Sequence, residues 1–412
     1  MLLSRLTIVT TITAAAVALA SAAAARSENV LYSFRRAQGV QPVARLLLDK
    51  ETGALYGTTP RGGVADGGPV GGTVFKLAQS NGQWKATVIF NFGTDVYGRS
   101  PYAGLIEDST GALYGTTHEG GSSEDGTVFE LTRSGDAWNE QVLHSFTAGN
   151  DGAGPATALT LDKATGEFYG TTWGGGYSGC GTVFNLAQSG GSWKEKVIFS
   201  FLLHKFDDCE RPASNLHEDS SGALFGLSDA DDGYYGTAYR LRRSGRGGEW
   251  QEDIIHTFGT NGDGSEPADM VLAPDGTIYG TTLDGGSVGS SCGILFELTF
   301  SKKVWSETII WDFGAAGDGC RPRGVYLDSR SGALYATTEQ GGAHDTGTVA
   351  KFAQSGGTWT EKILYSFGYQ PDGELPYARV IEDEHTGTLY GTTAFGGAHG
   401  QRGLGTAFEI VR

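Results

Sequence analysis

The chain has 412 residues, with 47 acidic and 30 basic side chains and a formal net charge of −17. An acidic surface repels phosphate backbones, so we expect no nucleic-acid partner. Glycine is abundant at 66 residues, methionine and proline are scarce, and short β-branched and aromatic runs alternate with turn residues, which predicts an all-β protein.

Residues 1–25 have the features of a secretory signal sequence. Arg5 precedes an apolar stretch from Leu6 to Leu19, and small residues follow up to Ala25. An N-terminal membrane anchor is the alternative, although the stretch is short and alanine-rich for a span. We therefore predict a secreted or periplasmic protein that has no membrane span after signal cleavage, with residues 26–412 forming a single domain.

One motif, with the consensus G-x-L-Y-G-T-T, recurs every 54 to 58 residues along the rest of the chain. Its aromatic residue falls at Tyr56, Tyr114, Tyr169, Phe225, Tyr279, Tyr335 and Tyr390. A regular period of this kind indicates a repeat architecture. Each repeat carries four strand-like runs, which in the second repeat are residues 101–108, 112–117, 126–131 and 138–146. Four antiparallel strands per repeat is the blade pattern of a β-propeller.

The two ends of the chain indicate how the repeats close. The run 30–34 matches the fourth strand of the last complete repeat at 363–367, whereas the chain stops after a third strand at 405–410. Pairing the two ends in a ring removes an exposed sheet edge. The sequence therefore predicts a seven-bladed β-propeller whose N-terminal strand completes the last blade. Each first strand begins at a proline, namely Pro42, Pro101, Pro155, Pro212, Pro267, Pro322 and Pro376.

The four cysteines test this topology. Cys180 and Cys292 each precede a third strand, while Cys209 and Cys320 each precede the first-strand proline of the next blade. The start of the third strand lies beside the end of the fourth, so we predict the disulfides Cys180–Cys209 and Cys292–Cys320. Zinc binding is the weaker alternative, because the pairs lie two blades apart and lack C-x-x-C spacing.

The composite repeat joins G-T-V-F-x-L, W-x-x-x-V-L-Y-S-F, D-G-x-x-P and L-x-x-D-x-x-G-x-L-Y-G-T-T. It resembles the GloVer tandem-repeat proteins of bacteria over about residues 29–412. The resemblance implies a secreted or surface-anchored repeat protein with a propeller fold and no established activity. The fourth repeat departs from the pattern at Phe225-Gly226-Leu227-Ser228, and the sixth has Ala336 in place of glycine.

Most recurrent polar and aromatic residues are explained by structure. Asp-Gly pairs in the blade-to-blade loops suit tight turns, although calcium binding by Asp151, Asp263, Asp318 and Asp372 stays open as the alternative. A tryptophan that recurs six times, from Trp84 to Trp359, indicates packing at one blade position. Apart from possible calcium we expect no cofactor and no metal.

The first strands surround the channel of a propeller, so their residues were aligned from the proline. The second position holds Ala44, Ala103, Thr157, Ser214, Asp269, Gly324 and Ala378. The third holds Arg45, Gly104, Ala158, Asn215, Met270, Val325 and Arg379. Neither position supplies a ring of histidines or carboxylates, which argues against a channel metal site or a paired-carboxylate hydrolase.

The loops that follow T-T differ between the repeats and are the candidate binding surface. Their aromatic and polar side chains suit carbohydrate, because rings stack on sugar faces and carboxylates accept hydroxyl hydrogens. The candidate binding residues are His118, Glu119, Trp173, Tyr177, Asp284, Glu339, His344 and Phe395. Ordinary variation in solvated loops is the competing interpretation.

These observations favour a monomeric, non-catalytic protein that binds an extracellular glycan or protein through its loop-rich face. Two alternatives remain. One is an extracellular enzyme acting on a polysaccharide or a lactone with histidines and carboxylates from the same loops. The other is a purely structural surface protein.

Overall fold

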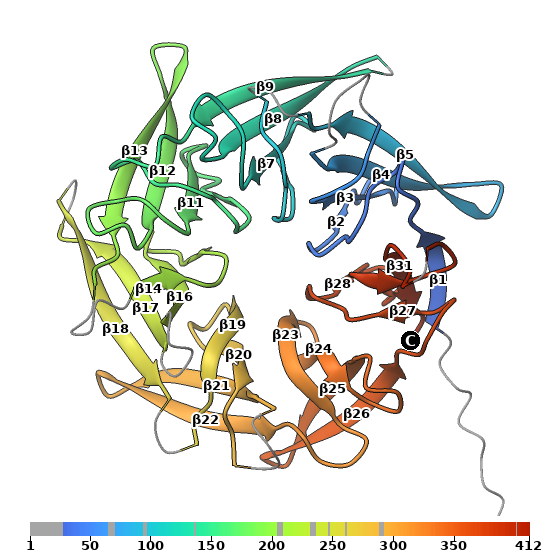
Figure 1. The fold of residues 1–412 in the computed structure, drawn as a ribbon. Helices are drawn as coiled ribbons and strands as arrows, with labels where there is room; N and C mark the ends of the chain where they lie inside the picture. Colours follow the sequence, from blue (N-terminus) through green and yellow to red (C-terminus); the bar gives the residue numbers. More distant parts are fainter. Residues whose placement is uncertain are drawn as a thin grey trace, which may run out of the picture.

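A computed structural model describes residues 28–64, 71–93, 97–135, 137–203, 209–230, 236–245, 248–259, 262–287, 292–400 and 402–412. The signal sequence predicted over 1–25 lies outside these residues. The described residues contain strands and turns but no helix, and hence no helix able to cross a membrane. The strands form a ring of seven sheets around a central channel, which confirms the predicted seven-bladed propeller (Figure 1).

The blades are numbered in chain order, and their strands run from the channel outward. Blade 1 contains β2 (Leu47–Leu48), β3 (Leu55–Thr59), β4 (Thr73–Ser80) and β5 (Gln83–Asn91). Blade 2 contains β6 (Ile106–Glu107), β7 (Leu113–Thr117), β8 (Thr127–Ser134) and β9 (Ala137–Ser145). Blade 3 contains β10 (Thr160–Leu161), β11 (Phe168–Thr172), β12 (Thr182–Ser189) and β13 (Ser192–Ser200). Blade 4 contains β14 (Glu210–Pro212) and β15 (His217–Glu218), then β16 (Leu224–Ala230), β17 (Gly236–Arg243) and β18 (Trp250–Phe258).

The remaining blades follow the same order. Blade 5 contains β19 (Ser265–Leu272), β20 (Ile278–Asp284), β21 (Ile294–Ser301) and β22 (Val304–Asp312). Blade 6 contains β23 (Gly319–Asp328), β24 (Ala333–Gly341), β25 (Thr348–Ser355) and β26 (Thr358–Ser366). Blade 7 contains β28 (Ile381–Glu382), β29 (Leu389–Thr393), β31 (Thr406–Ile410) and β1 (Glu28–Ser33), with a small ribbon formed by β27 (Gly373–Glu374) and β30 (Phe395–Gly396) beside it.

The ring closes through the two ends of the described chain. β1 pairs antiparallel with β31, so the N-terminal strand completes blade 7 as predicted. A second link joins blade 7 to blade 1, because the Thr392 hydroxyl donates to the Ala44 carbonyl at 3.1 Å. Closure therefore rests on a strand pair at the rim and a hydrogen bond near the channel.

The innermost strands are shorter than the sequence predicted in most blades. A strand was expected over 101–108, but β6 covers only Ile106–Glu107. Blades 5 and 6 are the exception, with long inner strands that carry a bulge just after Pro267 and Pro322. In the other blades the described residues between the proline and the short inner strand make no ladder pairs, and most of them line the channel.

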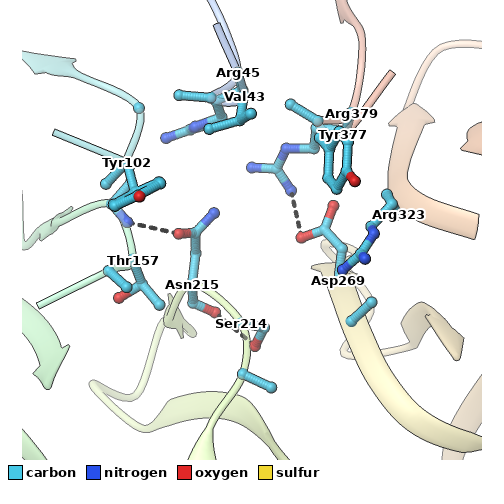
Figure 2. A pocket seen from close by; sticks show the side chains of 18 residues that line it. Val43, Arg45, Tyr102, Thr157, Ser214, Asn215, Asp269, Arg323, Tyr377 and Arg379 are labelled. Carbon is cyan, nitrogen blue, oxygen red and sulfur yellow. Dashed lines mark hydrogen bonds and ion pairs between the residues drawn. The ribbon is translucent and has the colours of Figure 1, made fainter. Parts of the chain in front are cut away.

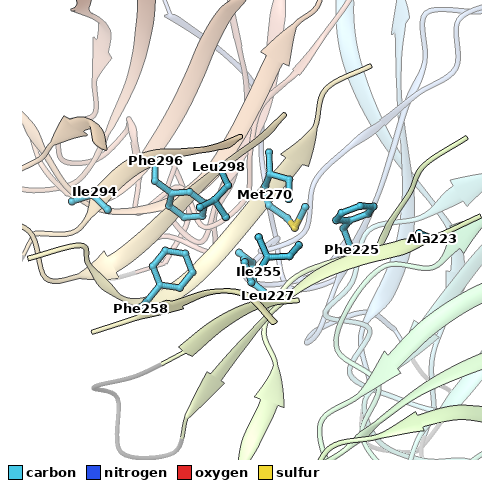
Figure 3. Packing of buried hydrophobic residues seen from close by; sticks show 11 residues of the cluster. Ala223, Phe225, Leu227, Ile255, Phe258, Met270, Ile294, Phe296 and Leu298 are labelled. Atoms are coloured by element: carbon cyan, nitrogen blue, oxygen red, sulfur yellow. The ribbon is translucent and has the colours of Figure 1, made fainter. Parts of the chain in front are cut away.

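The motif Y-G-T-T requires glycine because an aromatic side chain on the neighbouring strand packs against that position. Gly115 pairs with Phe129 on the neighbouring strand, and a Cβ at Gly115 would lie 2.6 Å from Phe129 Cζ. The same pairing with phenylalanine or tyrosine holds in every blade except blade 6. There Ala336 pairs with Ala350, so both departures from the consensus occur at facing positions. Figure 3 shows the equivalent ring in blade 5, Phe296, packed against Phe258 and Met270.

The two threonines of the motif have separate structural roles. The Thr58 hydroxyl donates to the Ala103 carbonyl of the next blade at 2.8 Å. The Thr59 hydroxyl lies 2.8 Å from that of Thr73, which begins the third strand of its own blade. The first threonine thus links neighbouring blades and the second fixes the loop between two strands.

The recurrent tryptophans pack at the seams between blades, as predicted. Trp138 of blade 2 meets Tyr56 of blade 1 edge-on, with ring centroids 6.1 Å apart. The seam between blades 6 and 7 falls where the tryptophan is absent, and there the Arg412 guanidinium lies 4.9 Å from the centroid of Tyr335. An arginine therefore covers the tyrosine that a tryptophan covers elsewhere.

Both predicted disulfides are present. Cys180 is bonded to Cys209 and Cys292 to Cys320, with sequence separations of 29 and 28 residues. Each bond ties the loop before a third strand to the segment that enters the next blade. The described chain contains no free cysteine.

Candidate functional site

The channel at the centre of the ring holds two cavities that meet at a narrow point. A cavity of about 150 Å³ faces the loop-rich end, where the blade-to-blade loops lead into the first strands. A larger one of about 930 Å³ opens toward the short turns that follow those strands. Arg45, Asn215 and Arg379 line both cavities. We call these three residues, together with Asp269, the waist of the channel (Figure 2).

The entrance on the loop-rich side, here called the mouth, is formed by the first residue after each first-strand proline. Each blade supplies one side chain to this ring, and the members are Val43, Tyr102, Ala156, Ala213, Ala268, Arg323 and Tyr377. Tyr102, Val43 and Tyr377 come from blades 2, 1 and 7, which are neighbours in the ring. They give one side of the mouth an aromatic and apolar lining (Figure 2).

Polar contacts hold the side chains of the mouth in place. The Arg323 Nε donates to Glu339 Oε2 at 2.6 Å, and its guanidinium carbon lies 4.9 Å from the Tyr377 ring centroid. The Tyr377 hydroxyl donates to Glu339 Oε1 at 3.4 Å. In blade 2, Tyr102 packs edge-on against His118 with ring centroids 5.8 Å apart. The two tyrosines are therefore preorganised.

At the waist, Asp269 and Arg379 form a loose ion pair held by the backbone. Arg379 Nη1 lies 3.8 Å from Asp269 Oδ1 and donates to the Met270 carbonyl at 3.2 Å. Asp269 Oδ2 accepts from the Val325 N–H at 3.1 Å. Burial raises the pKa of Asp269, and the charge of Arg379 opposes that rise. Both side chains are about nine-tenths buried.

Arg45 lies beside this pair without a carboxylate of its own. Its Nε is buried and has no hydrogen-bond partner among the described residues. The pKa of Arg45 is lowered to about 9, chiefly by burial and then by the neighbouring positive charge of Arg379. The negative charge of Asp269 raises the pKa by a smaller amount. The side chain has space because residue 104 is glycine, where a Cβ would lie 2.7 Å from Arg45 Cγ.

The remaining groups at the waist add no charge. Asn215 Oδ1 accepts from the Ala158 N–H at 2.7 Å, and Figure 2 shows its amide nitrogen directed into the channel. Burial, together with the charges of Arg379 and Arg45, lowers the pKa of His217 to about 3, so its ring is neutral. Two guanidinium groups thus face one carboxylate, and the waist carries an excess positive charge within a protein of net charge −17.

The structure brings two of the predicted binding residues, Glu339 and His118, into contact with the mouth, and connects Asp284 to Glu339 through Arg321. Glu339 contacts Arg323 and Tyr377 as described, and His118 packs on Tyr102. Asp284 accepts from Arg321 Nη1 at 2.9 Å, and Arg321 Nε lies 4.0 Å from Glu339. Glu339 and Asp284 therefore belong to one ion-pair network across blades 5 and 6.

The other predicted binding residues lie away from the channel. A hydrogen bond from Arg99 lowers the pKa of Glu119 and holds its carboxylate at 2.7 Å. The Arg211 guanidinium stacks on Trp173 at 4.1 Å, and Tyr177 in the same loop is 86% exposed. His344 is exposed and packs on Tyr369, while Phe395 is half-buried in β30.

One group of described residues has the composition of a metal site. The side-chain ligand atoms of His256, Asp263 and Glu307 lie within 4.8 Å of one another between blades 4 and 5. The equivalent of His256 in blade 6 is Tyr365, whose hydroxyl donates to Asp372 at 2.8 Å. Because the same acidic position takes a tyrosine donor there, we interpret the group as a repeated structural contact between strand and loop.

The Asp-Gly loops show the geometry of turns. Asp372 accepts from the Gly368 N–H at 2.6 Å and from the Gly373 N–H at 2.7 Å. Asp263 likewise accepts from the Gly259 N–H at 3.1 Å. Because these carboxylates accept hydrogen bonds from backbone N–H groups of their own loops, they support the turn interpretation, which the sequence favoured over calcium binding.

The sequence analysis did not identify the channel site, because it considered only positions at which the same chemical type recurs in every blade. Arg45, Asn215, Asp269 and Arg379 all appeared in the aligned first strands, but each occurs only once or twice in seven positions. The first residue after proline was not aligned, so Tyr102, Arg323 and Tyr377 were missed. A usable signal was present, since bulky or charged residues stand among alanines and glycines at positions crowded around an axis.

Comparison with known proteins places the repeat in a described family. A family model described as Gloeobacter/Verrucomicrobia repeat matches residues 18–163, 70–246 and 212–411, which confirms the resemblance seen in the sequence. No curated protein matches the chain.

Solved structures share the fold at low identity. The U3-55K structure has a TM-score of 0.55 at 11% identity and covers 94% of this chain and 99% of its own. A proposed 6-phosphogluconolactonase from Bacteroides uniformis has a TM-score of 0.52 at 14% identity, covering 82% and 92%. A protein from Lactobacillus plantarum has a TM-score of 0.51 at 13% identity, covering 78% and 84%. Likeness at these identities shows the fold alone.

Proposed function

The chain belongs to the Gloeobacter/Verrucomicrobia repeat family, and from that premise we propose that it is a non-catalytic protein that binds glycan at the mouth of its channel. The observation that carries the proposal is the mouth itself. Tyr102 and Tyr377 flank an open cavity and are fixed by His118 and Glu339. Rigid aromatic rings beside polar groups are the usual chemistry of sugar recognition.

The mouth supports binding better than catalysis. Among the described residues that line the smaller cavity at the mouth, Asp269 is the only carboxylate, and it is engaged by Val325 and Arg379. General acid–base hydrolysis of a glycoside needs a second carboxyl group across the bond. The likeness to a proposed 6-phosphogluconolactonase is a likeness of fold and supplies no activity for this chain.

An extracellular or periplasmic location fits this role. Two disulfide bonds suggest a compartment outside the reducing cytoplasm. The signal sequence predicted over residues 1–25 agrees with that location and stays a prediction.

The test is binding of the mature protein to a glycan array, with calcium and with EDTA. We expect saturable binding that falls about two- to twelvefold in Tyr102→Ala and in Tyr377→Ala, since stacking on one ring contributes about 0.5–1.5 kcal/mol. Tyr177→Ala is the matched control, because Tyr177 is an exposed aromatic on the same face but away from the mouth.

Two results would contradict the proposal. Binding that is lost in Tyr177→Ala or Trp173→Ala but kept in the mouth variants would place recognition at the seam between blades 3 and 4. If no glycan on the array binds, a protein partner or a structural role would become the leading explanation of the function. Loss of binding in EDTA would restore calcium binding by the Asp-Gly loops.

A further inference from the structure

The unbalanced charge at the waist identifies the class of ligand. Building on the proposed function, we infer that the ligand is an acidic sugar whose carboxylate binds Arg45 and Arg379 at the waist while its ring lies at the mouth. The inference rests on three observations. They are the missing partner of Arg45, the depth of the waist below the tyrosines and the overall charge of the protein.

The first observation is that Arg45 is charged and that its buried Nε has no hydrogen-bond partner among the described residues. Arginine stays protonated at neutral pH even with a pKa of about 9. Buried charges in proteins are paired, because an unpaired one loses its hydration without compensation. Arg379 already contacts Asp269 and the Met270 carbonyl, so Asp269 cannot balance both guanidinium groups. A bound anion would complete the hydrogen bonding of Arg45.

The second observation is the spacing between the aromatic and the cationic levels. Tyr377 and Arg379 are separated by one residue on the same segment, as are Val43 and Arg45. Both segments bend at the intervening residue, and of these four residues only Arg379 and Arg45 also line the larger cavity beyond, so the guanidinium groups lie deeper than the Tyr377 ring. This order suits one hexuronic acid unit, with its ring beside the tyrosines and its carboxylate at the guanidinium groups.

The third observation is the charge of the whole molecule. The waist has an excess of one positive charge, which matches a monoanion, whereas the surrounding protein has a net charge of −17 and disfavours polyanions. Guanidinium forks pair with carboxylates in a planar, bidentate manner. A sulfate ester on a neutral sugar is the other monoanionic source, and the experiment separates the two.

The experiment is isothermal titration calorimetry of the mature protein at low ionic strength. The probes are an oligosaccharide of neutral sugars that ends in a single glucuronate, the same oligomer with that carboxylate reduced to an alcohol, and a neutral oligosaccharide carrying a sulfate ester. Monomeric glucuronate is the fourth probe. Arg45→Gln removes the charge of that guanidinium, and Arg133→Gln is the control because Arg133 is exposed on β8 and far from the channel.

We expect the oligomer with one terminal glucuronate to bind and the reduced oligomer to bind at least about tenfold more weakly. Arg45→Gln should weaken binding of the acidic oligomer by a similar factor, and Arg133→Gln should leave it unchanged. Equal binding of the acidic and the reduced oligomer, or an unchanged affinity in Arg45→Gln, overturns the acidic-sugar assignment and leaves glycan binding in place. Preference for the sulfate ester overturns the carboxylate assignment.

Failure of the broader function gives a different pattern. Suppose that no oligosaccharide binds, but that glucuronate binds and Arg45→Gln abolishes its binding. This result would support the anion site and contradict glycan recognition at the mouth. A thermal measurement without ligand provides a second readout. Because the buried Nε of Arg45 has no hydrogen-bond partner among the described residues, Arg45→Gln should melt at the same temperature as the wild type or higher. A clear loss of stability would show that Arg45 is already satisfied within the protein and would overturn the inference.

Discussion

The second and first strands of each blade differ in how their residues are used. On the second strand, the Y-G-T-T residues make the same contacts around most of the ring, from the Gly115–Phe129 pair to the hydrogen bond of Thr58 with the next blade. On the segment that leads into the first strand, the side chains presented to the channel vary from blade to blade. Residues that repeat in most blades build the scaffold, and residues found in only one or two blades line the candidate site.

This contrast explains why departures from the repeat have two meanings. A departure that is matched across a strand pair preserves packing, as with Ala336 and Ala350 in blade 6. A departure such as Arg45, which uses the space left by Gly104, leaves a buried Nε without a hydrogen-bond partner among the described residues. The predictions below test the scaffold side of the comparison, and the titrations described above test the site.

The largest effect is expected from disturbing a glycine–phenylalanine pair. Gly115→Ala places a Cβ against the Phe129 ring and should destabilise the protein by about 1–3 kcal/mol. Phe129→Ala should destabilise it by about 3–5 kcal/mol through the cavity it leaves. The double variant copies blade 6 and should be no worse than Phe129→Ala alone. Chemical denaturation of the four proteins measures the coupling between the two positions.

Blade 6 offers the matched control for this cycle. Ala336→Gly should destabilise by only about 0.5–1 kcal/mol, because it removes a methyl group and adds backbone freedom. Strictly additive effects of Gly115→Ala and Phe129→Ala would show that the ring does not dictate the glycine. The explanation of the Y-G-T-T motif would then be wrong.

A smaller effect, about 3 kcal/mol for each bond, is expected from removing a disulfide. The paired variants are Cys180→Ser with Cys209→Ser and Cys292→Ser with Cys320→Ser. Their loops are of nearly equal length, 29 and 28 residues, so the chain-entropy argument predicts nearly equal losses. The check is the denaturation midpoint of each variant with and without a reducing agent. If reducing agent lowers the midpoint of the wild type but not that of a variant with all four cysteines replaced, its effect is due to these two bonds.

The sequence was sufficient for the scaffold because scaffold contacts recur. The blade number, the β1–β31 closure and both disulfides followed from positions counted along seven copies. Inner-strand lengths did not follow, because hydrogen bonding after the proline depends on how closely the segments approach the axis. The sequence pattern continues through 101–108, whereas the ladder is limited to Ile106–Glu107.

The site was less accessible to the same reasoning because it is assembled from single residues on different blades. Glu339 and Asp284 were selected for their chemistry, and their carboxylates bind Arg323 and Arg321 respectively. The waist depends on Arg45 and Arg379, which are 334 residues apart in sequence and meet only because the ring closes between blades 1 and 7. Charge balance at such a point is a property of the closed ring.

The smallest effect concerns acidic pairs at the seams between blades, and it depends on pH. Burial raises the pKa of Glu307 to about 7, and the Asp263 charge adds to the rise. An unfolded glutamate has a pKa near ~4.3, so the folded state binds more protons between about pH 4.3 and 7. The free energy of unfolding therefore contains a contribution that is present below about pH 4.3 and is lost as the pH rises through 7.

Glu307→Gln keeps a neutral group of similar shape at that position and should remove this part of the pH dependence. We expect its melting temperature to exceed that of the wild type by about 1–3 °C at pH 8 and to match it at about pH 4. Glu195, whose pKa is raised to about 7 by burial and by Asp151, should respond in the same way. Exposed Glu249→Gln is the control and should shift neither value. A gain that is equal at both pH values would indicate better packing by the amide, and would separate the seam from any titration of its carboxyl groups.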